Sequence, residues 1–174
     1  MQPRTHLAID RRLCGEPLDA AGTAAGSARV GLTAVPEMAA DAAGLVHGGF
    51  VFGLADHAAM LAVNHPNVVL GSAAVRFLRP VAVGERLVAE ATVVESAGRK
   101  SRVTVEVRRV PAGGTGGAGT YGVGGASAAA AEAAGETVMS GEMVCFSLDR
   151  HVLEPAGGER GDGPAETPRP EKSA

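Results

Sequence analysis

Residues 45–66 read LVHGGFVFGLADHAAMLAVNHP and hold one carboxylate, Asp56, in an otherwise almost wholly apolar run. Alanine, leucine and methionine are frequent from Gly48 to about Asn64, and no proline occurs before Pro66, which predicts a helix. With about 100° between successive residues, nearly every direction around that helix is apolar. A helix that is hydrophobic on all sides is buried. The rest of the fold is therefore expected to wrap around it.

Most of the chain outside this helix has the pattern of β-strands. In the clearest case Val103, Val105 and Val107 alternate with polar residues, which predicts that one face of the strand turns toward a core. We expect strands at residues 28–35, 68–78, 87–94, 102–110 and 137–148. Long strands joined by short turns favour an antiparallel meander. The pattern predicts an α+β hot-dog fold, in which a twisted antiparallel β-sheet is wrapped around one long buried helix.

Two segments lack the composition of a packed core. Residues 111–134 are rich in glycine and alanine and lie between two predicted strands, so we interpret them as a loop insertion. Residues 154–174 are rich in proline, glycine and charge, which predicts a disordered tail. The remainder, residues 1–153, is predicted to be one hot-dog domain that begins with a helical turn or two in residues 5–13.

The composition argues against several classes of partner. The net charge is −3 over 174 residues, so no basic surface indicates binding to nucleic acid or to an anionic membrane. The N-terminus has no apolar stretch of signal-peptide length, and no run reaches the roughly 18 apolar residues of a membrane span. Cys14 and Cys145 form no metal-binding pattern and are interpreted as free thiols of a reducing compartment. These features together predict a cytoplasmic protein.

Asp56 and the HGG turn, residues 47–49, are the candidate reactive groups. Burial would raise the pKa of Asp56, which is typical of a functional carboxylate, although an Asp bonded to a loop or a partner subunit explains it equally. The first N–H groups of a helix have no intrahelical acceptor and suit an oxyanion, and glycine at Gly48 and Gly49 admits a ligand or serves close packing.

The spacing of these two groups has a consequence for assembly. Asp56 lies eight residues after Gly48, which is about 12 Å along a helix axis. Both groups must lie within about 3 Å of the reacting atoms, so one helix cannot supply both. Two antiparallel helices related by a two-fold axis can. For a site that uses both groups, the spacing predicts a dimer in which each Gly48 faces the Asp56 of the other subunit.

Other catalytic patterns find no support in the sequence. His57 is adjacent to Asp56 but about 100° away around the helix, which makes it a poor direct partner and favours a structural role. No HExxH pair supports zinc hydrolysis. Ser72 and Ser140 lack the GxSxG context of a serine hydrolase. We expect neither a metal nor an organic cofactor.

HGGFVFGLAD, followed by Asn64, FLRP at residues 77–80 and the turn at Gly84, resembles the hot-dog acyl-CoA thioesterase superfamily, and within it the phenylacetate-pathway thioesterase group. The resemblance covers residues 5–153 without the insertion. It implies that Asp56 is the general base or nucleophile and that the Gly48 N–H polarises the thioester carbonyl. It further implies that His47 shapes that end of the site, while the insertion departs from the short hairpin usual in the group.

The resemblance also implies an acyl-CoA substrate. Candidates for the acyl pocket and its polar surroundings are Gly49, Phe52, Met60 and Asn64. Candidates for the CoA phosphates are Arg79, Arg99 and Lys100, for which ordinary solvated surface charge is the alternative. The expected assembly is a homodimer or a dimer of dimers, that is, a homotetramer.

Two other functions stay open. One is a non-catalytic acyl-CoA-binding or regulatory hot-dog protein, which would bind the ligand without turnover. The other is an enoyl-CoA hydratase, which would need an Asp and a His converging on one water. Adjacent residues on a helix, such as Asp56 and His57, point in different directions, so this alternative is weaker.

Overall fold

The computed structural model describes residues 2–18, 25–111 and 135–154. Its elements, in chain order, are α1 (Arg11–Cys14), β1 (Glu16–Pro17), β2 (Ser27–Thr33), the 3-10 helix η1 (Pro36–Met38), α2 (Gly48–Val63), β3 (Val68–Phe77), β4 (Arg86–Ala97), β5 (Lys100–Val110) and β6 (Glu136–Ser147). The predicted long helix is confirmed to within one residue at its C-terminal end.

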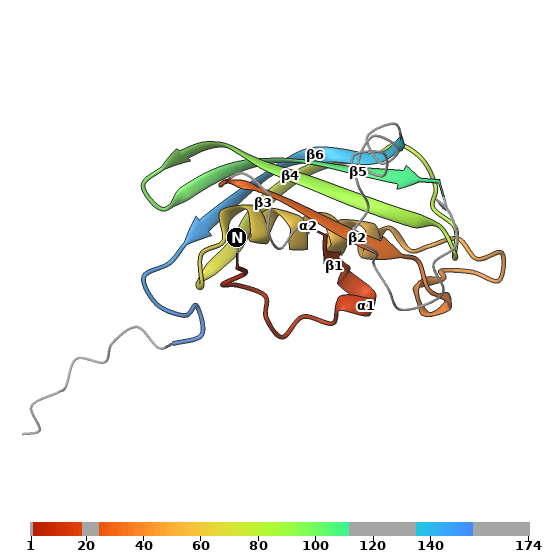
Figure 1. Cartoon of the computed structure of the whole chain (residues 1–174), viewed down its shortest axis with the longest axis horizontal. Helices are drawn as coiled ribbons and strands as arrows, with labels where there is room; N and C mark the ends of the chain where they lie inside the picture. Colours follow the sequence, from red (N-terminus) through yellow and green to blue (C-terminus); the bar gives the residue numbers. More distant parts are fainter. Residues whose placement is uncertain (1, 19–24, 112–134, 155–174) are drawn as a thin grey trace, which may run out of the picture.

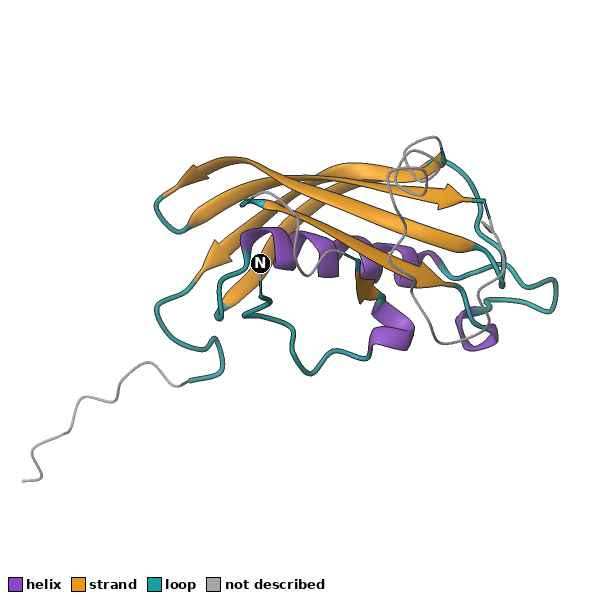
Figure 2. Cartoon of the chain, viewed as in Figure 1, coloured by secondary structure: helices purple, strands orange, loops and turns teal. Residues whose placement is uncertain are grey.

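The strands form one antiparallel sheet in the order β1-β2-β4-β5-β6-β3. The predicted fold class is confirmed: the twisted sheet curves over the single long helix α2 (Figures 1 and 2). The predicted meander was only partly right: β1 is next to β2 and β4, β5 and β6 follow one another, but β3 does not lie between β2 and β4. β3 pairs with β6 and lies at the sheet edge, because β2 already occupies the free side of β4.

The core lies between the sheet and α2. Leu54, Ala55 and Ala58 on the helix are fully buried, as are Leu87 on β4 and Val103 and Val107 on β5. The helix ends at Asn64, which adopts the left-handed conformation with φ 50° and leads to Pro66. Glycine and asparagine are the residues that most readily adopt this conformation at a helix end. The apolar helix is thus buried, as its sequence predicted.

The side of α2 opposite the sheet is covered by an N-terminal strap, residues 2–10 (Figure 1). A helical turn or two was expected in residues 5–13, but the helix is confined to α1, with Asp10 as its N-cap. Upstream of Asp10 the strap is irregular and is tied to the end of α2. The backbone N–H of Arg4 donates to Asn64 Oδ1 at 2.7 Å, and Asn64 Nδ2 donates to the Gln2 carbonyl at 3.1 Å.

The two segments predicted to lie outside the core fall almost entirely outside the described residues. The predicted insertion, residues 111–134, lies between β5 and β6, which pair directly with each other. The insertion, the tail at residues 154–174 and the boundary of the domain at residue 153 therefore stay predictions. None of the helices in the described part of the chain has the length and hydropathy needed to cross a bilayer.

Candidate functional site

The N-terminus of α2 is capped by the side chain of His47. His47 has an extended backbone, with φ −63° and ψ 128°, and its Nδ1 atom accepts a hydrogen bond from the Gly49 N–H at 3.0 Å. A Cβ atom at position 49 would lie 2.8 Å from that nitrogen, so glycine is required for this cap. Among the described residues, none accepts a hydrogen bond from the Gly48 N–H. That donor is therefore free to bind an external oxygen.

The cap gives the first testable prediction. We expect His47→Ala to lower the free energy of unfolding by about 1 kcal/mol, because the Gly49 N–H loses its acceptor. His47→Ser, which supplies a side-chain oxygen at the N-cap, should recover most of that loss. Urea denaturation followed by circular dichroism measures both effects. Equal unfolding free energies for the alanine variant and wild type would show that the cap contributes nothing.

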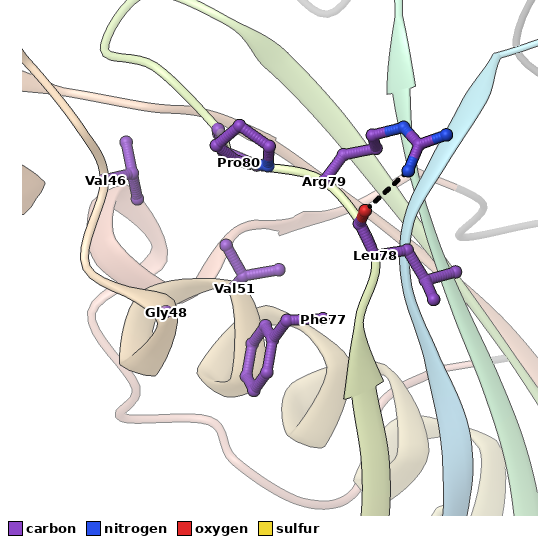
Figure 3. Close-up of a pocket in the computed structure, with 8 residues that line it drawn as sticks. Val46, Gly48, Val51, Phe77, Leu78, Arg79 and Pro80 are labelled. Carbon is purple, nitrogen blue, oxygen red and sulfur yellow. Dashed lines mark hydrogen bonds between the residues drawn. The ribbon is translucent and has the colours of Figure 1, made fainter.

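An apolar cavity of about 300 Å³ lies beside the free Gly48 N–H (Figure 3). Residues from α2, from the loop before it and from the segment after β3 line it: Val46, Gly48, Val51, Phe77, Leu78, Arg79, Pro80 and Val81. Gly48 lies close to Phe77, since a Cβ atom at position 48 would be 3.3 Å from the ring. Phe77 and Leu78 are 55% and 42% exposed, so two large apolar side chains remain in contact with solvent at this site.

Sequence reasoning found only part of this cavity. The FLRP segment, residues 77–80, was used as a family motif. Within this segment, only Arg79 was assigned a role, as a candidate contact of the CoA phosphates. The apolar lining was missed because Val46, Val51 and Val81 look like ordinary core residues. Backbone hydrogen bonds from Val46 N to Val81 O, at 2.8 Å, and from Val83 N to Gly44 O, at 2.9 Å, bring the two segments together in the tertiary structure.

Asp56 lies eight residues further along the same uninterrupted helix, about 12 Å from Gly48 along the axis. Its side chain is partly buried, and its Oδ1 atom is buried without a hydrogen-bond partner among the described residues. Burial raises the pKa of Asp56 above its ordinary value, and the charge of His6 acts in the opposite direction. An unpaired buried carboxylate oxygen is costly, which is typical of a functional group rather than a stabilising one.

His57 has the structural role that the sequence favoured. It is 2% exposed, and its Nδ1 atom lies 3.1 Å from the Cys14 carbonyl oxygen, to which it donates. Burial lowers the pKa of His57, which keeps its ring neutral. Burial, assisted by the charge of Asp56, raises the pKa of the Cys145 thiol to about 11. Cys145 is therefore a packed thiol and no nucleophile at neutral pH.

The other predicted binding residues differ in how accessible they are. Phe52 is half-buried on the same side of α2 as Asp56, whereas Met60 is 1% exposed and packs in the core. Asn64 lies at the opposite end of the helix from Gly48, and both polar atoms of its side chain bond to the strap. The structure thus gives Asn64 a structural task that the sequence did not suggest. The binding roles of these three residues stay predictions.

The structure separates the predicted phosphate-binding residues. Arg79 lies at the cavity rim, where it donates to Glu136 at 3.1 Å and to the Leu78 carbonyl at 2.9 Å (Figure 3). Glu136 also accepts a hydrogen bond from Arg109 on β5. Arg109 and Lys100 are nine residues apart on this strand, a distance of about 30 Å. Arg99 lies in the β4–β5 turn near Lys100 and pairs with Asp149 at 3.2 Å. Arg79 therefore cannot share one phosphate group with Arg99 and Lys100 of its own chain.

Within residues 2–18, 25–111 and 135–154, no three His, Cys, Asp or Glu side chains come together in a way that could hold a metal ion.

The fold and the site together define a class of protein: a buried helix that begins with two glycines and carries one carboxylate lies under an antiparallel sheet. Comparison with known families identifies the same class. The model of the thioesterase superfamily matches residues 43–113, which contain α2, β3, β4 and β5. The chain belongs to this superfamily of hot-dog proteins.

Solved structures extend the likeness over most of the chain. An uncharacterized protein from Pyrococcus horikoshii shares 42% sequence identity with a TM-score of 0.71, over 88% of this chain and 98% of that chain. A mutant of the phenylacetic acid degradation protein PaaI from Thermus thermophilus shares 26% identity with a TM-score of 0.57, over 78% of this chain and 95% of that chain. The second protein carries the name of the pathway group that the sequence resembles.

A curated relative with a different name matches one part of its length. Methylthioribose-1-phosphate isomerase from Aquifex aeolicus is 52% identical over 106 residues, which is 61% of this chain and 23% of that protein. The chain thus spans less than a quarter of that relative, and the similarity concerns one segment of it.

Proposed function

We propose that this protein is an acyl-CoA thioesterase in which Asp56 is the general base or nucleophile and the Gly48 N–H polarises the thioester carbonyl. The observation that carries the proposal is the buried Oδ1 atom of Asp56, which has no hydrogen-bond partner in the part of the chain that the structure describes. Because burial raises the pKa of this carboxyl group, it is a stronger base than an exposed aspartate. Membership of the thioesterase superfamily supports the same reaction.

The chemistry needs little beyond these two groups. As general base, Asp56 takes a proton from water while the water oxygen bonds to the carbonyl carbon. The carbonyl oxygen gains negative charge, which the Gly48 N–H at the positive end of the α2 dipole stabilises. The C–S bond then breaks, and CoA leaves as a thiolate, which needs no strong acid because a free thiol has a pKa near 8.5. As nucleophile, Asp56 would form an anhydride that water hydrolyses to the same products.

We further propose that each site combines Gly48 of one subunit with Asp56 of its partner. The separation of about 12 Å along one straight helix supports this arrangement. The edge of the sheet offers a contact, since among the described residues β3 pairs with β6 alone and its residues 71–74 are exposed. A ten-residue edge strand is a template for pairing with a second copy. A homodimer, or a dimer of dimers, would cover it.

The apolar cavity beside Gly48 is the proposed place for the acyl group, with His47 and Gly49 holding the end of α2 in shape. Phe52, on the Asp56 side, would contact the same group across the subunit boundary, with Met60 behind it. Arg79 at the rim of this cavity, and Arg99 with Lys100 from the other subunit, are the proposed contacts of the CoA phosphates. The two cysteines are free, which fits the predicted cytoplasmic location.

The proposal is tested by incubating the purified full chain with short, medium and aromatic acyl-CoAs and measuring the release of free thiol with a chromogenic disulfide. We expect turnover of at least one apolar acyl-CoA. Tight binding of acyl-CoA without thiol release would favour the non-catalytic binding protein instead. Loss of the enoyl absorbance of crotonyl-CoA without thiol release would favour the hydratase. Either result would overturn the thioesterase assignment.

A further inference from the structure

Arg79, at the rim of the cavity, begins a chain of four charged side chains that alternate in sign. Its Nε atom donates to Glu136 Oε1 at 3.1 Å, and Glu136 Oε2 accepts from Arg109 Nη2 at 2.9 Å. Arg109 Nη1 in turn donates to Glu85 Oε1 at 2.6 Å. Glu136 therefore lies between two guanidinium groups and binds one with each of its carboxylate oxygens.

The inner pair of this chain, Arg109 with Glu85, is also bonded to the backbone. Arg109 Nη2 lies 3.4 Å from the Pro80 carbonyl oxygen, and Glu85 Oε2 accepts from the Ala82 N–H at 3.0 Å. The side chains of Arg109 and Glu85 are only 30% and 25% exposed. Arg109 therefore ties the segment after β3, which lines the cavity, to the end of β5.

The position of Glu136 is set by the pairing of β5 with β6. Glu136 and Arg109 lie opposite each other in this pairing, so their side chains are neighbours on one face of the sheet. The preceding residue, Gly135, packs directly on β5, since a Cβ atom at position 135 would lie 2.5 Å from the Arg109 carbonyl oxygen. The sheet itself thus places the Glu136 carboxylate beside Arg109, with or without Arg79.

The outer pair, Arg79 with Glu136, is by contrast open to solvent. The two side chains are 60% and 53% exposed, and an exposed ion pair of this kind adds little stability. The side chain of Arg79 extends away from Gly48, and its Nη1 atom donates to the Leu78 carbonyl at 2.9 Å (Figure 3). An anion at the rim can therefore replace Glu136 on Arg79, while Glu136 stays paired with Arg109.

We propose that Glu136 competes with the CoA phosphates for Arg79 and so weakens the binding of CoA at this rim. This inference rests on the proposed function, in which Arg79 contacts those phosphates. Phosphate and carboxylate oxygens accept the same charge-assisted hydrogen bonds from a guanidinium group. When the phosphate binds, Arg79 exchanges one anion for the other. When the product CoA leaves, Glu136 is in place to bind Arg79 again, which favours product release.

The test measures the Kd of CoA for the purified full chain by isothermal titration calorimetry. Glu136→Gln removes the negative charge but keeps an oxygen that accepts from Arg109. We expect it to lower the Kd of CoA by about two- to fivefold at low ionic strength, the range that corresponds to one exposed ion pair. Most of this gain should disappear in about 1 M salt, which screens exposed charges beyond about 3 Å. The Kd of pantetheine, which lacks the phosphates, should not change.

Arg79→Gln separates competition from simple repulsion. We expect it to raise the Kd of CoA, and the addition of Glu136→Gln should then bring no further gain, because the contested guanidinium group is absent. An unchanged Kd in Arg79→Gln would overturn the proposal. An equal gain from Glu136→Gln with and without Arg79 would show that Glu136 only repels the phosphates, and would overturn it too. An equal change in the Kd of pantetheine would overturn it by assigning Glu136 to the shape of the cavity wall.

Glu16→Gln is the matched control. Glu16 pairs with Arg11 at the same distance of 3.1 Å, but between β1 and α1, which contribute no residue to the described lining of the cavity. Its Kd for CoA should equal that of wild type. Binding of CoA in the expected pattern without thiol release from any acyl-CoA would contradict only the proposed function. Hydrolysis with an unchanged Kd in Glu136→Gln would contradict only this inference, and a wild type that does not bind CoA would contradict both.

Discussion

Asp56→Asn is expected to lower kcat for acyl-CoA hydrolysis by about 10²- to 10⁴-fold, because an amide cannot take the proton of the attacking water. The amide is close in size to the carboxyl group, so the packing of α2 should be preserved. The measurement is steady-state thiol release with the best acyl-CoA of the panel. The KM is expected to change little, since the carboxylate acts on the water and not on the bound thioester.

The same substitution should stabilise the protein. Burial raises the pKa of Asp56 in the native state above its unfolded value, so the native state holds a proton at pH values where the unfolded chain has lost it. Stability therefore falls as the pH rises through the interval between the two pKa values. Asp56→Asn removes this pH-dependent loss of stability. The melting temperature of the variant should therefore exceed that of wild type at neutral pH, and the two melting temperatures should converge in acid.

Glu142→Gln is the control for both effects, since it makes the same chemical change at a half-exposed position on β6. It should alter neither kcat nor the pH dependence of stability. A variant Asp56→Asn with full activity would remove Asp56 from the reaction. A loss of both activity and stability would instead assign Asp56 a structural role.

Gly48→Pro should lower kcat/KM by about 10²- to 10³-fold, because it removes the N–H that polarises the carbonyl. The helix should tolerate it, because proline suits the first helical position and the extended backbone of His47 is the conformation required before proline. Gly48→Ala is the matched control: it keeps the N–H but crowds Phe77 in the same way, with its Cβ atom 3.3 Å from the ring. Equal losses in both variants would attribute the effect to crowding.

Mixing the two inactive variants tests whether sites are shared between subunits. In a mixed dimer of Asp56→Asn and Gly48→Pro, one site would combine the two intact groups and the other would combine the two altered ones. Random exchange of equal amounts should therefore restore about a quarter of wild-type activity. Subunits are exchanged by mild denaturation and refolding, and each variant alone serves as the control. No recovery in samples with proven exchange would show that sites are not shared in this way.

The main elements could be predicted because local patterns are strong in them. The helix was expected from Gly48 to about Asn64 and ends at Val63. The strand expected at residues 87–94 extends over Arg86–Ala97. Its hydrogen-bonded pairing with β5 continues past Val94 as far as the pair Ala97 and Lys100. Apolar periodicity indicates which residues face the core. The hydrogen bonds between strands continue past the edge of the core, so a strand can be longer than its apolar pattern.

The position of β3 and the shape of the strap could not be predicted in this way. Residues 68–78 look like any strand, and their alternation does not tell which strand they pair with; β6 is nearly seventy residues further on. The strap has no periodicity, and its ties join residues about sixty positions apart. Such contacts depend on which surfaces remain free once the sheet has formed, so local sequence carries little information about them.

Residues 45–66 thus contain most of what could be learned without coordinates: a helix apolar on all sides must be buried, and a carboxylate on it must be desolvated. The fixed rise of the helix then separates Asp56 from Gly48 by about 12 Å. Only the tertiary structure revealed the cavity beside Gly48, the His47 cap and the stacking of the His6 ring on that of His57. These features arise where distant segments meet, and their geometry follows from packing of the whole chain.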